Sequence, residues 1–90
     1  MTRLHVVVRG RVQGVGFRWF VREAARDAKL AGWVRNRRDG TVELEVEGPA
    51  AAVDAFRAVI ARGPDGAVVA SIDEVAVSVD ALAQPFTIIR

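Results

Sequence analysis

Residues 10–18 contain the side chains of this sequence whose types and spacing best suit a chemical role. Their sequence, GRVQGVGFR, places Gly14 and Gly16 between an apolar run and a helical pattern that begins at Phe17. Glycine accepts positive φ angles and leaves backbone N–H groups uncovered, and the first N–H groups of a helix lack intrahelical acceptors. The stretch is therefore typical of a nest that binds an anion such as phosphate.

Arg18 adds a positive group at the start of the predicted helix. Its planar guanidinium matches two phosphate oxygens, and helical Cα–Cβ bonds tilt toward the N-terminus, so the side chain can reach back to the nest. From the pattern alone, a tight turn with a solvated arginine is an equally good interpretation. A Walker loop is excluded because no lysine follows the glycines, and a dinucleotide fingerprint is excluded because Trp19 replaces the third glycine.

The remaining side chains exclude most other kinds of catalytic site. There is no cysteine, His5 is the single histidine, and both serines, Ser71 and Ser78, lie in the C-terminal third. No Ser/His/Asp triad can be built around the glycines and no cluster has metal-ligand spacing, so we expect neither a metal nor a cofactor. An anion nest, an arginine and neutral polar side chains suit attack by water on a substrate that is already reactive.

Composition describes one small domain with an uneven charge. The 90 residues can bury a single modest core, no apolar run is long enough to span a bilayer, and no secretory signal precedes the first predicted strand. We expect a monomeric cytoplasmic protein that binds neither membranes nor nucleic acid. Residues 1–40 carry ten Lys or Arg and three Asp or Glu, a balance of +7, whereas residues 41–90 carry three and eight, a balance of −5. Such a basic half can attract an anion. For most of these arginines, a solvated face with charge pairs across the fold is the better interpretation.

Hydrophobic periodicity predicts the first elements that position these residues. A period of two predicts a strand over residues 1–11 with His5 facing outward, since Leu4, Val6 and Val8 alternate with His5, Val7 and Arg9. A single apolar stripe predicts a helix from residue 17 to about residue 28, with Arg22 and Arg26 pointing outward from its later turns and Trp19 at a packing edge.

The middle of the chain predicts a hairpin. Asp39-Gly40 lies between alternating segments at residues 33–37 and 41–47, which predicts two strands and a short turn. The apolar residues of the second strand would face the core and its three glutamates the solvent. We therefore expect an antiparallel sheet that is covered on one side only.

Glycine and proline mark the remaining elements. A second helix is predicted to open at Gly48-Pro49 and to end at Gly63-Pro64. Further strands are predicted at residues 72–79 and, after Pro85, at residues 86–89. The order β-α-β-β-α-β with a short closing strand predicts the α+β, ferredoxin-like sandwich, in which two helices cover one face of an antiparallel sheet.

Three segments together resemble the acylphosphatase family. They are GRVQGVGFR at residues 10–18, GWVRN at residues 32–36 and DGTVE at residues 39–43, and the likeness continues through Gly63-Pro64 to Ile88. The resemblance covers essentially the whole chain and implies one acylphosphatase-like domain over residues 1–90. It implies an enzyme that hydrolyses the carboxyl-phosphate bond of acyl phosphates to a carboxylate and inorganic phosphate.

The resemblance also implies roles for individual residues. Arg18 matches the family's phosphate-binding arginine, and Asn36 matches its water-positioning asparagine. The phosphate-cradling loop is matched by Gln13, Gly14, Val15, Gly16 and Phe17. An amide such as that of Asn36 cannot act as a general base, so a phosphate oxygen of the substrate would take the proton of the water.

Two departures from the family pattern lie at the end of the first predicted helix. Lys29 stands where the family usually has glycine, and Ala28 is smaller than the leucine that is common there. A non-glycine residue in the left-handed region costs roughly 1–2 kcal/mol, so this helix end is expected to differ locally.

Two other classes of function share parts of the pattern. RNA-recognition domains have the same order of strands and helices, but they bind bases on the exposed face of the sheet, where this chain would present Glu43, Glu45 and Glu47. A regulatory domain that binds an acyl phosphate without turnover would have the same glycine loop. Turnover of a simple acyl phosphate separates these alternatives.

Overall fold

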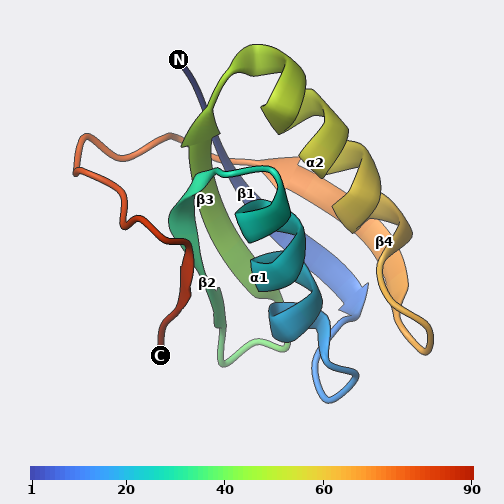
Figure 1. The fold of residues 1–90 in the computed structure, drawn as a ribbon. Coiled ribbons are helices and arrows are strands. Elements are labelled where there is room, and N and C mark those ends of the chain that lie inside the picture. Colours follow the sequence, from blue (N-terminus) through green and yellow to red (C-terminus); the bar gives the residue numbers. More distant parts are fainter.

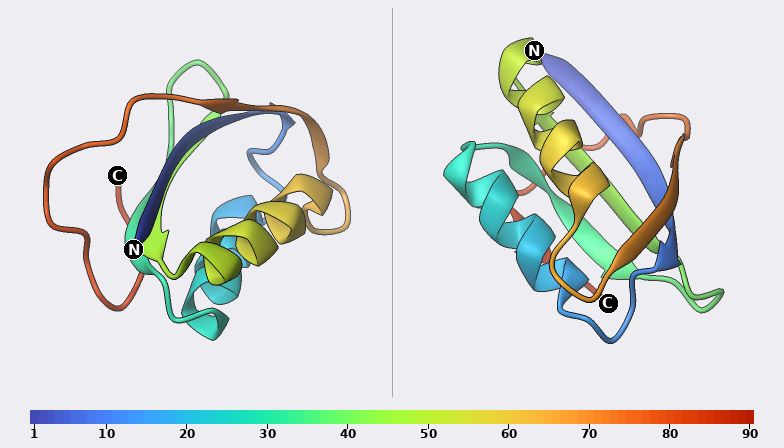
Figure 2. Two further views of the ribbon diagram at one scale, coloured as in Figure 1. Left: turned by 90° about the horizontal axis from the view of Figure 1, so that it is seen from above. Right: turned by 90° about the vertical axis from the view of Figure 1, so that its right-hand side faces the viewer.

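The computed structural model describes residues 1–90 as one five-stranded sheet with two helices. The elements are β1 (Thr2–Arg11), α1 (Phe17–Asp27), β2 (Ala31–Asn36), β3 (Val42–Gly48), α2 (Ala50–Arg62), β4 (Val68–Glu74) and β5 (Thr87–Ile88). The strand order is β4-β1-β3-β2-β5, and both helices lie on the same face of the sheet (Figures 1 and 2). The predicted ferredoxin-like order is confirmed. The short closing strand differs in one respect, because β5 runs parallel to β2 in an otherwise antiparallel sheet.

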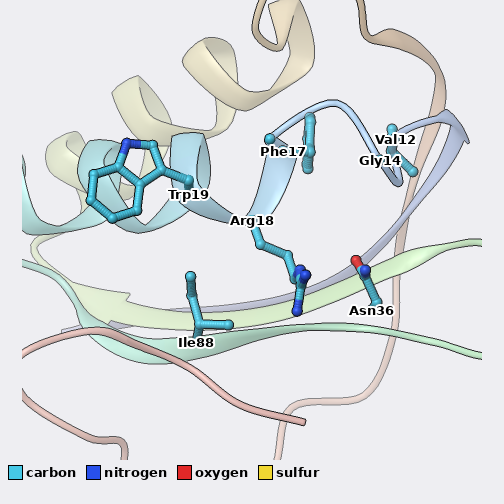
Figure 3. A pocket seen from close by; sticks show the side chains of 8 residues that line it. Val12, Gly14, Phe17, Arg18, Trp19, Asn36 and Ile88 are labelled. Atoms are coloured by element: carbon cyan, nitrogen blue, oxygen red, sulfur yellow. The ribbon is translucent and has the colours of Figure 1, made fainter.

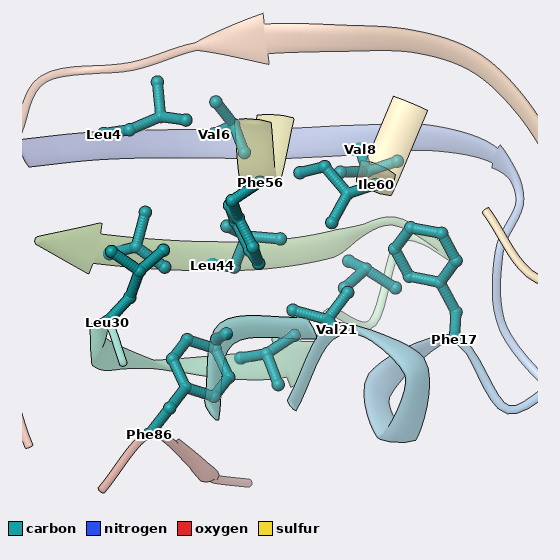
Figure 4. Packing of buried hydrophobic residues seen from close by; sticks show 14 of the residues in the cluster. Leu4, Val6, Val8, Phe17, Val21, Leu30, Leu44, Phe56, Ile60 and Phe86 are labelled. Carbon is teal, nitrogen blue, oxygen red and sulfur yellow. The ribbon is translucent and has the colours of Figure 1, made fainter. Parts of the chain in front are cut away.

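The hydrophobic core fills the space between the sheet and the helices, as Figure 4 shows. Phe17 from α1, Phe56 from α2 and Leu44 from β3 are almost completely buried, and Phe86 closes the core beside β5. Burying a side chain of this size stabilises the fold by about 1.5–3 kcal/mol. Because Phe17 is the first residue of α1, this packing fixes the start of the helix over the sheet.

The fourth strand lies earlier in the chain than the alternation predicts. It covers Val68–Glu74 instead of residues 72–79, and the later valines Val75, Val77 and Val79 are exposed. After Val75, which donates its N–H to the carbonyl of His5, the chain leaves the edge of β1 and crosses the sheet. Alternating valines occur in any extended segment, so their period does not reveal whether the segment pairs with a strand.

The crossing segment, residues 75–80, covers part of the face that lies opposite the helices (Figure 2). The prediction that Glu45 faces solvent is therefore wrong, because its side chain is fully buried. Its carboxylate accepts hydrogen bonds from the N–H of Ser78 at 2.8 Å and from the Ser78 hydroxyl at 2.9 Å. His5 does face away from the core, but it is half-buried between Glu43 and the Ala76 carbonyl.

The end of α1 keeps its usual geometry despite the unusual residue there. Lys29 has a φ of 58° and is the one non-glycine residue with a positive φ. The N–H of Leu30 reaches back to the Ala25 carbonyl at 2.9 Å, a bond typical of a helix that ends in a left-handed residue. Lys29 thus adopts the strained conformation, and the expected local difference in the helix end does not occur.

Two further boundaries were predicted less accurately than the order of elements. The hairpin strands are Ala31–Asn36 and Val42–Gly48, so each is shifted by one or two residues from its prediction.

Neither helix is long and apolar enough to cross a membrane.

Candidate active site

A cleft of about 350 Å³ lies where the β1–α1 loop and the first turn of α1 meet the end of β2 and strand β5. We call it the loop cleft, and Figure 3 shows its side chains. Its polar lining comes from Gly14, Gly16, Arg18 and Asn36. Its apolar lining comes from Val12, Phe17, Trp19 and Ile88.

The glycine loop presents bare backbone to the cleft. Gly14 and Gly16 both have a φ of 76°, a conformation that side chains rarely adopt, and a Cβ on either would meet no atom within 4 Å. Gly16 is the N-cap of α1, where no side chain caps the helix. No backbone N–H from Gln13 to Trp19 donates a hydrogen bond within the protein. The loop and the helix start therefore hold a row of free donors, which favours an anion.

Arg18 is the charged side chain of the loop cleft. It is exposed, and its guanidinium has no hydrogen bond or ion pair within the protein. In Figure 3 the side chain extends from the first turn of α1 toward the end of β2, where its tip faces Asn36. The N–H groups of its guanidinium are thus free to bind a ligand in the cleft.

Asn36 is the last residue of β2 and faces the loop cleft from the sheet. Its Oδ1 is buried and is the only buried side-chain polar atom without a hydrogen-bond partner. Such an orphaned acceptor costs stability unless another molecule donates to it. The structure thus brings the predicted residues Arg18 and Asn36 together in one cleft.

The predicted cradling residues divide into two groups. Gly14, Gly16 and Phe17 line the loop cleft, whereas Gln13 and Val15 do not. The amide Nε2 of Gln13 instead donates to the backbone carbonyls of Arg37 and Thr41, and Val15 packs against the core. Gln13 therefore fastens the loop to the β2–β3 hairpin.

Three residues that line the cleft, Val12, Trp19 and Ile88, are absent from the predicted site. Val12 belongs to the glycine-rich stretch and is otherwise part of the core. Trp19 follows Arg18 directly and lies outside the apolar stripe of the helix. A large aromatic residue in this position, beside an anion motif, was the signal that could have identified it. Ile88 gave no signal, because its position depends on the pairing of β5 with β2.

The prediction that Arg22 points outward as a solvated charge is wrong, whereas Arg26 is exposed as predicted. The guanidinium of Arg22 stacks on the Trp19 ring at 3.9 Å from its centroid, and that of Arg26 donates to the Phe86 carbonyl at 2.9 Å. Arg22 therefore supports the Trp19 ring of the cleft, and Arg26, although exposed, is bound to the segment that precedes β5.

The carboxylates of Asp39 and Glu43, in the β2–β3 turn and on β3, form hydrogen bonds within the fold. Hydrogen bonds from the hydroxyl and N–H of Thr41 hold the pKa of Asp39 below its usual value. Burial raises the pKa of Glu43, but hydrogen bonds from His5 and Arg35 outweigh it and leave the pKa lowered. No group of three or more His, Cys, Asp or Glu side chains is arranged to hold a metal ion.

Comparison with known proteins identifies the family. The acylphosphatase family matches residues 4–88. An acylphosphatase of Rhodopseudomonas palustris (strain BisB18) is 56% identical over 77 residues, which make up 86% of this chain and 78% of that protein.

Solved structures agree with this match. The crystal structure of an acylphosphatase from Bacillus subtilis has a TM-score of 0.92 and 41% identity, with both chains covered completely. A full-length HypF in its phosphate- and nucleotide-bound form has a TM-score of 0.83 and 31% identity, and the match covers 98% of this chain but only 12% of that one. The chain belongs to the acylphosphatase family, whose members are enzymes that hydrolyse acyl phosphates.

Proposed function

We propose that the loop cleft is the catalytic site, in which Arg18 and the glycine loop hold the phosphoryl group and Asn36 orients the attacking water. One observation carries this proposal. An unpaired guanidinium, a row of free backbone N–H groups and an unpartnered buried oxygen all meet in the same cleft.

The first step is binding of the phosphoryl group. Its oxygens accept hydrogen bonds from the free N–H groups around Gly14 and Gly16, where the dipole of α1 also favours negative charge. The guanidinium of Arg18 binds two of these oxygens as a planar fork. These donors are in place before the reaction, so they stabilise charge on the phosphoryl group without reorganising.

The second step is attack by water. Oδ1 of Asn36 accepts a hydrogen bond from the water. This contact orients a lone pair of the water oxygen toward phosphorus. An amide does not accept a proton at neutral pH, and Glu43 and Asp39 do not line the cleft. A phosphoryl oxygen of the substrate therefore takes the proton.

The bonds and charges balance without a further reactant. The water oxygen forms a bond to phosphorus, the bond between phosphorus and the acyl oxygen breaks, and the acyl group leaves as a carboxylate. The product is inorganic phosphate, which carries both hydrogens of the water, one on the attacking oxygen and one on the phosphoryl oxygen that took the proton. A carboxylate is a good leaving group, so positioning and electrostatic stabilisation are sufficient for catalysis.

Hydrolysis of acetyl phosphate in ¹⁸O-labelled water tests this assignment directly. Attack at phosphorus places the label in inorganic phosphate, whereas attack at the carbonyl carbon places it in acetate. Mass spectrometry of both products distinguishes the two. Label in acetate would overturn the proposal, because the donors of the cleft would then hold the wrong part of the substrate. A domain that only binds the acyl phosphate would release neither product.

A further inference from the structure

The loop cleft has two chemically different sides, which lie on opposite sides of Arg18. Gly14 and Asn36 lie on one side together with Val12, and Trp19 and Ile88 lie on the other, where no polar side chain lines the cleft, as Figure 3 shows. The polar side has a role in the proposed hydrolysis. The apolar side is left without one, although it is part of the same cleft.

The geometry of phosphoryl transfer assigns a role to the apolar side. The attacking and leaving oxygens lie roughly in line on opposite sides of phosphorus. If the water is held by Asn36, the acyl group must leave on the side away from Asn36, which is the side of Trp19 and Ile88. We infer that Trp19 and Ile88 form the binding site for the acyl group and select substrates with a flat, apolar acyl group. This inference rests on the proposed function of Asn36.

Trp19 offers a large apolar surface at the side of the cleft. Its side chain belongs to the first turn of α1 and is 58% exposed, which is unusual for so large an apolar residue. The guanidinium of Arg22, one turn later in α1, covers one face of the ring at 3.9 Å from the centroid. Arg22 also pairs with Glu23 at 3.2 Å, so its guanidinium contacts both residues. Arg22 is therefore a positioning residue that holds the Trp19 ring.

A second hollow beside the cleft offers a different environment for an acyl group. It is lined by charged and polar residues only, among them Arg37, Arg38 and Arg90, and it also contacts Asn36. This hollow would suit an acyl group that carries its own negative charge. It lies at the Asn36 end, from which the water attacks, so in-line displacement directs the leaving group away from it.

The test compares three substrates that differ only in the acyl group. Benzoyl phosphate has a flat apolar group, acetyl phosphate has a small one, and succinyl phosphate has an anionic one. For each, kcat/KM is measured in the wild type, Trp19→Ala and Trp33→Ala. Trp33 is the other tryptophan and lies on the opposite face of the sheet, where its ring contacts that of His5. Competitive inhibition by inorganic phosphate reports on the phosphate end of the cleft.

We expect the wild type to prefer benzoyl phosphate. Trp19→Ala should lower kcat/KM for benzoyl phosphate by about tenfold, as for the loss of one aromatic contact, and that for acetyl phosphate much less. Inhibition by phosphate should change little, and Trp33→Ala should keep the wild-type ratio between the substrates. Equal losses for benzoyl and acetyl phosphate in Trp19→Ala would overturn the inference. A preference for succinyl phosphate that Arg38→Ala removes would overturn it as well.

Variants of Arg22 distinguish a loss of support for the Trp19 ring from a general disruption of the fold. Arg22→Gln should lower the ratio of kcat/KM between benzoyl and acetyl phosphate by about threefold, since the ring loses one cation–π contact of roughly 0.5–1 kcal/mol. Arg22→Lys should restore part of that ratio. An unchanged ratio in Arg22→Gln would show that Trp19 needs no such support. Arg18→Ala, assayed in the same series, tests the proposed function separately, because it should abolish hydrolysis of all three substrates.

Discussion

The side-chain amide of Gln13 donates a hydrogen bond of 2.8 Å to the backbone carbonyl of Arg37, the residue that follows Asn36. The same nitrogen donates to the Thr41 carbonyl at 2.9 Å, so one side chain joins the glycine loop to both ends of the β2–β3 turn. The loop and Asn36 belong to segments that are distant in sequence. Gln13 therefore holds the two polar parts of the loop cleft at a fixed separation.

We predict that Gln13→Ala impairs both catalysis and stability. Loss of two hydrogen bonds should lower the free energy of unfolding by about 1–2 kcal/mol. Movement of the loop relative to Asn36 should lower kcat/KM for acetyl phosphate by roughly 10- to 100-fold. Denaturant unfolding and steady-state kinetics measure the two effects. Gln84→Ala is the control, because Gln84 is exposed and its side chain makes no hydrogen bond. Wild-type kcat/KM in Gln13→Ala would mean that the loop needs no fastening.

The order of elements was predictable from the sequence because local signals mark each boundary. Glycine and proline punctuate the helices, and Asp39-Gly40 marks the hairpin. The path of residues 75–80 was not predictable, since it depends on contacts with partners far away in the sequence. The His5 ring meets the Ala76 carbonyl, and Ser78 caps the Glu45 carboxylate. No local pattern encodes these pairs.

The candidate site was predictable to a similar extent. Gly14, Gly16 and Arg18 are close together in the sequence, so a tight loop followed by the first turn of a helix is enough to bring them together. The position of Asn36 in the same cleft followed from the family resemblance, and its role as the water-positioning residue stays a prediction. The fastening role of the Gln13 side chain and the place of Ile88 required the folded sheet, because both depend on long-range packing.

We predict that Asn36→Ala lowers kcat without weakening phosphate binding. The residue acts on the water, so loss of Oδ1 should reduce kcat by about 100-fold, as expected when a reactant is no longer held in place. The inhibition constant for inorganic phosphate should stay within about twofold, because the anion is held by the loop and Arg18. The melting temperature should not fall, since Oδ1 has no partner in the protein and its removal relieves the cost of an unpaired buried acceptor. Parallel losses of phosphate inhibition and kcat would assign Asn36 to the anion instead.

We predict that Ser78→Ala destabilises the fold. The Glu45 carboxylate is fully buried, and the hydroxyl of Ser78 is one of its two donors. Removing a hydrogen bond to a buried charged group should lower the free energy of unfolding by about 1–3 kcal/mol. Ser71→Ala is the matched control, because this half-buried serine on β4 makes no side-chain hydrogen bond. Equal stability of the two variants in urea would show that the Ser78 hydroxyl contributes nothing.

We predict that Glu43 stabilises the fold in a pH-dependent manner. Its pKa lies below the usual 4.5, because bonds from His5 and Arg35 outweigh the effect of burial. A lowered pKa in the folded state means that the stabilisation is complete above about pH 4.5 and is lost as pH falls through the lower folded-state value. Glu43→Gln should therefore be less stable than the wild type at pH 7, and the difference should shrink in acid.

Urea unfolding between pH 7 and pH 3 measures this difference for Glu43. Glu74→Gln is the control, because the Glu74 side chain is 65% exposed and its pair with Arg57 lies at the surface. Exposed pairs contribute about 0–1 kcal/mol, so this variant should resemble the wild type throughout. If the difference in the free energy of unfolding between Glu43→Gln and the wild type grew in acid, the lowered pKa assigned to Glu43 would be contradicted.

We predict that Arg18→Lys is severely impaired. Lysine keeps the charge but loses the planar fork that binds two phosphoryl oxygens at once. Loss of such a preorganised donor costs on the order of 10²–10³ in rate, about 3–4 kcal/mol of transition-state stabilisation. Arg18→Ala should in addition weaken competitive inhibition by inorganic phosphate, since the bound product uses the same guanidinium. The measurements are kcat/KM for acetyl phosphate and the inhibition constant for phosphate.

The choice of control for Arg18 follows from the structure. Arg22 is unsuitable because it stacks on Trp19 at the cleft, whereas Arg62, at the end of α2, is exposed and has no side-chain partner. Arg62→Lys and Arg62→Ala should leave both measured quantities within about twofold, as expected of a solvated charge. If Arg18→Lys retained near-wild-type kcat/KM, a point charge would suffice and the bidentate contact would be wrong. If the alanine variants of Arg18 and Arg62 lost activity equally, the loss would reflect net charge, and the loop cleft would not be the site of hydrolysis.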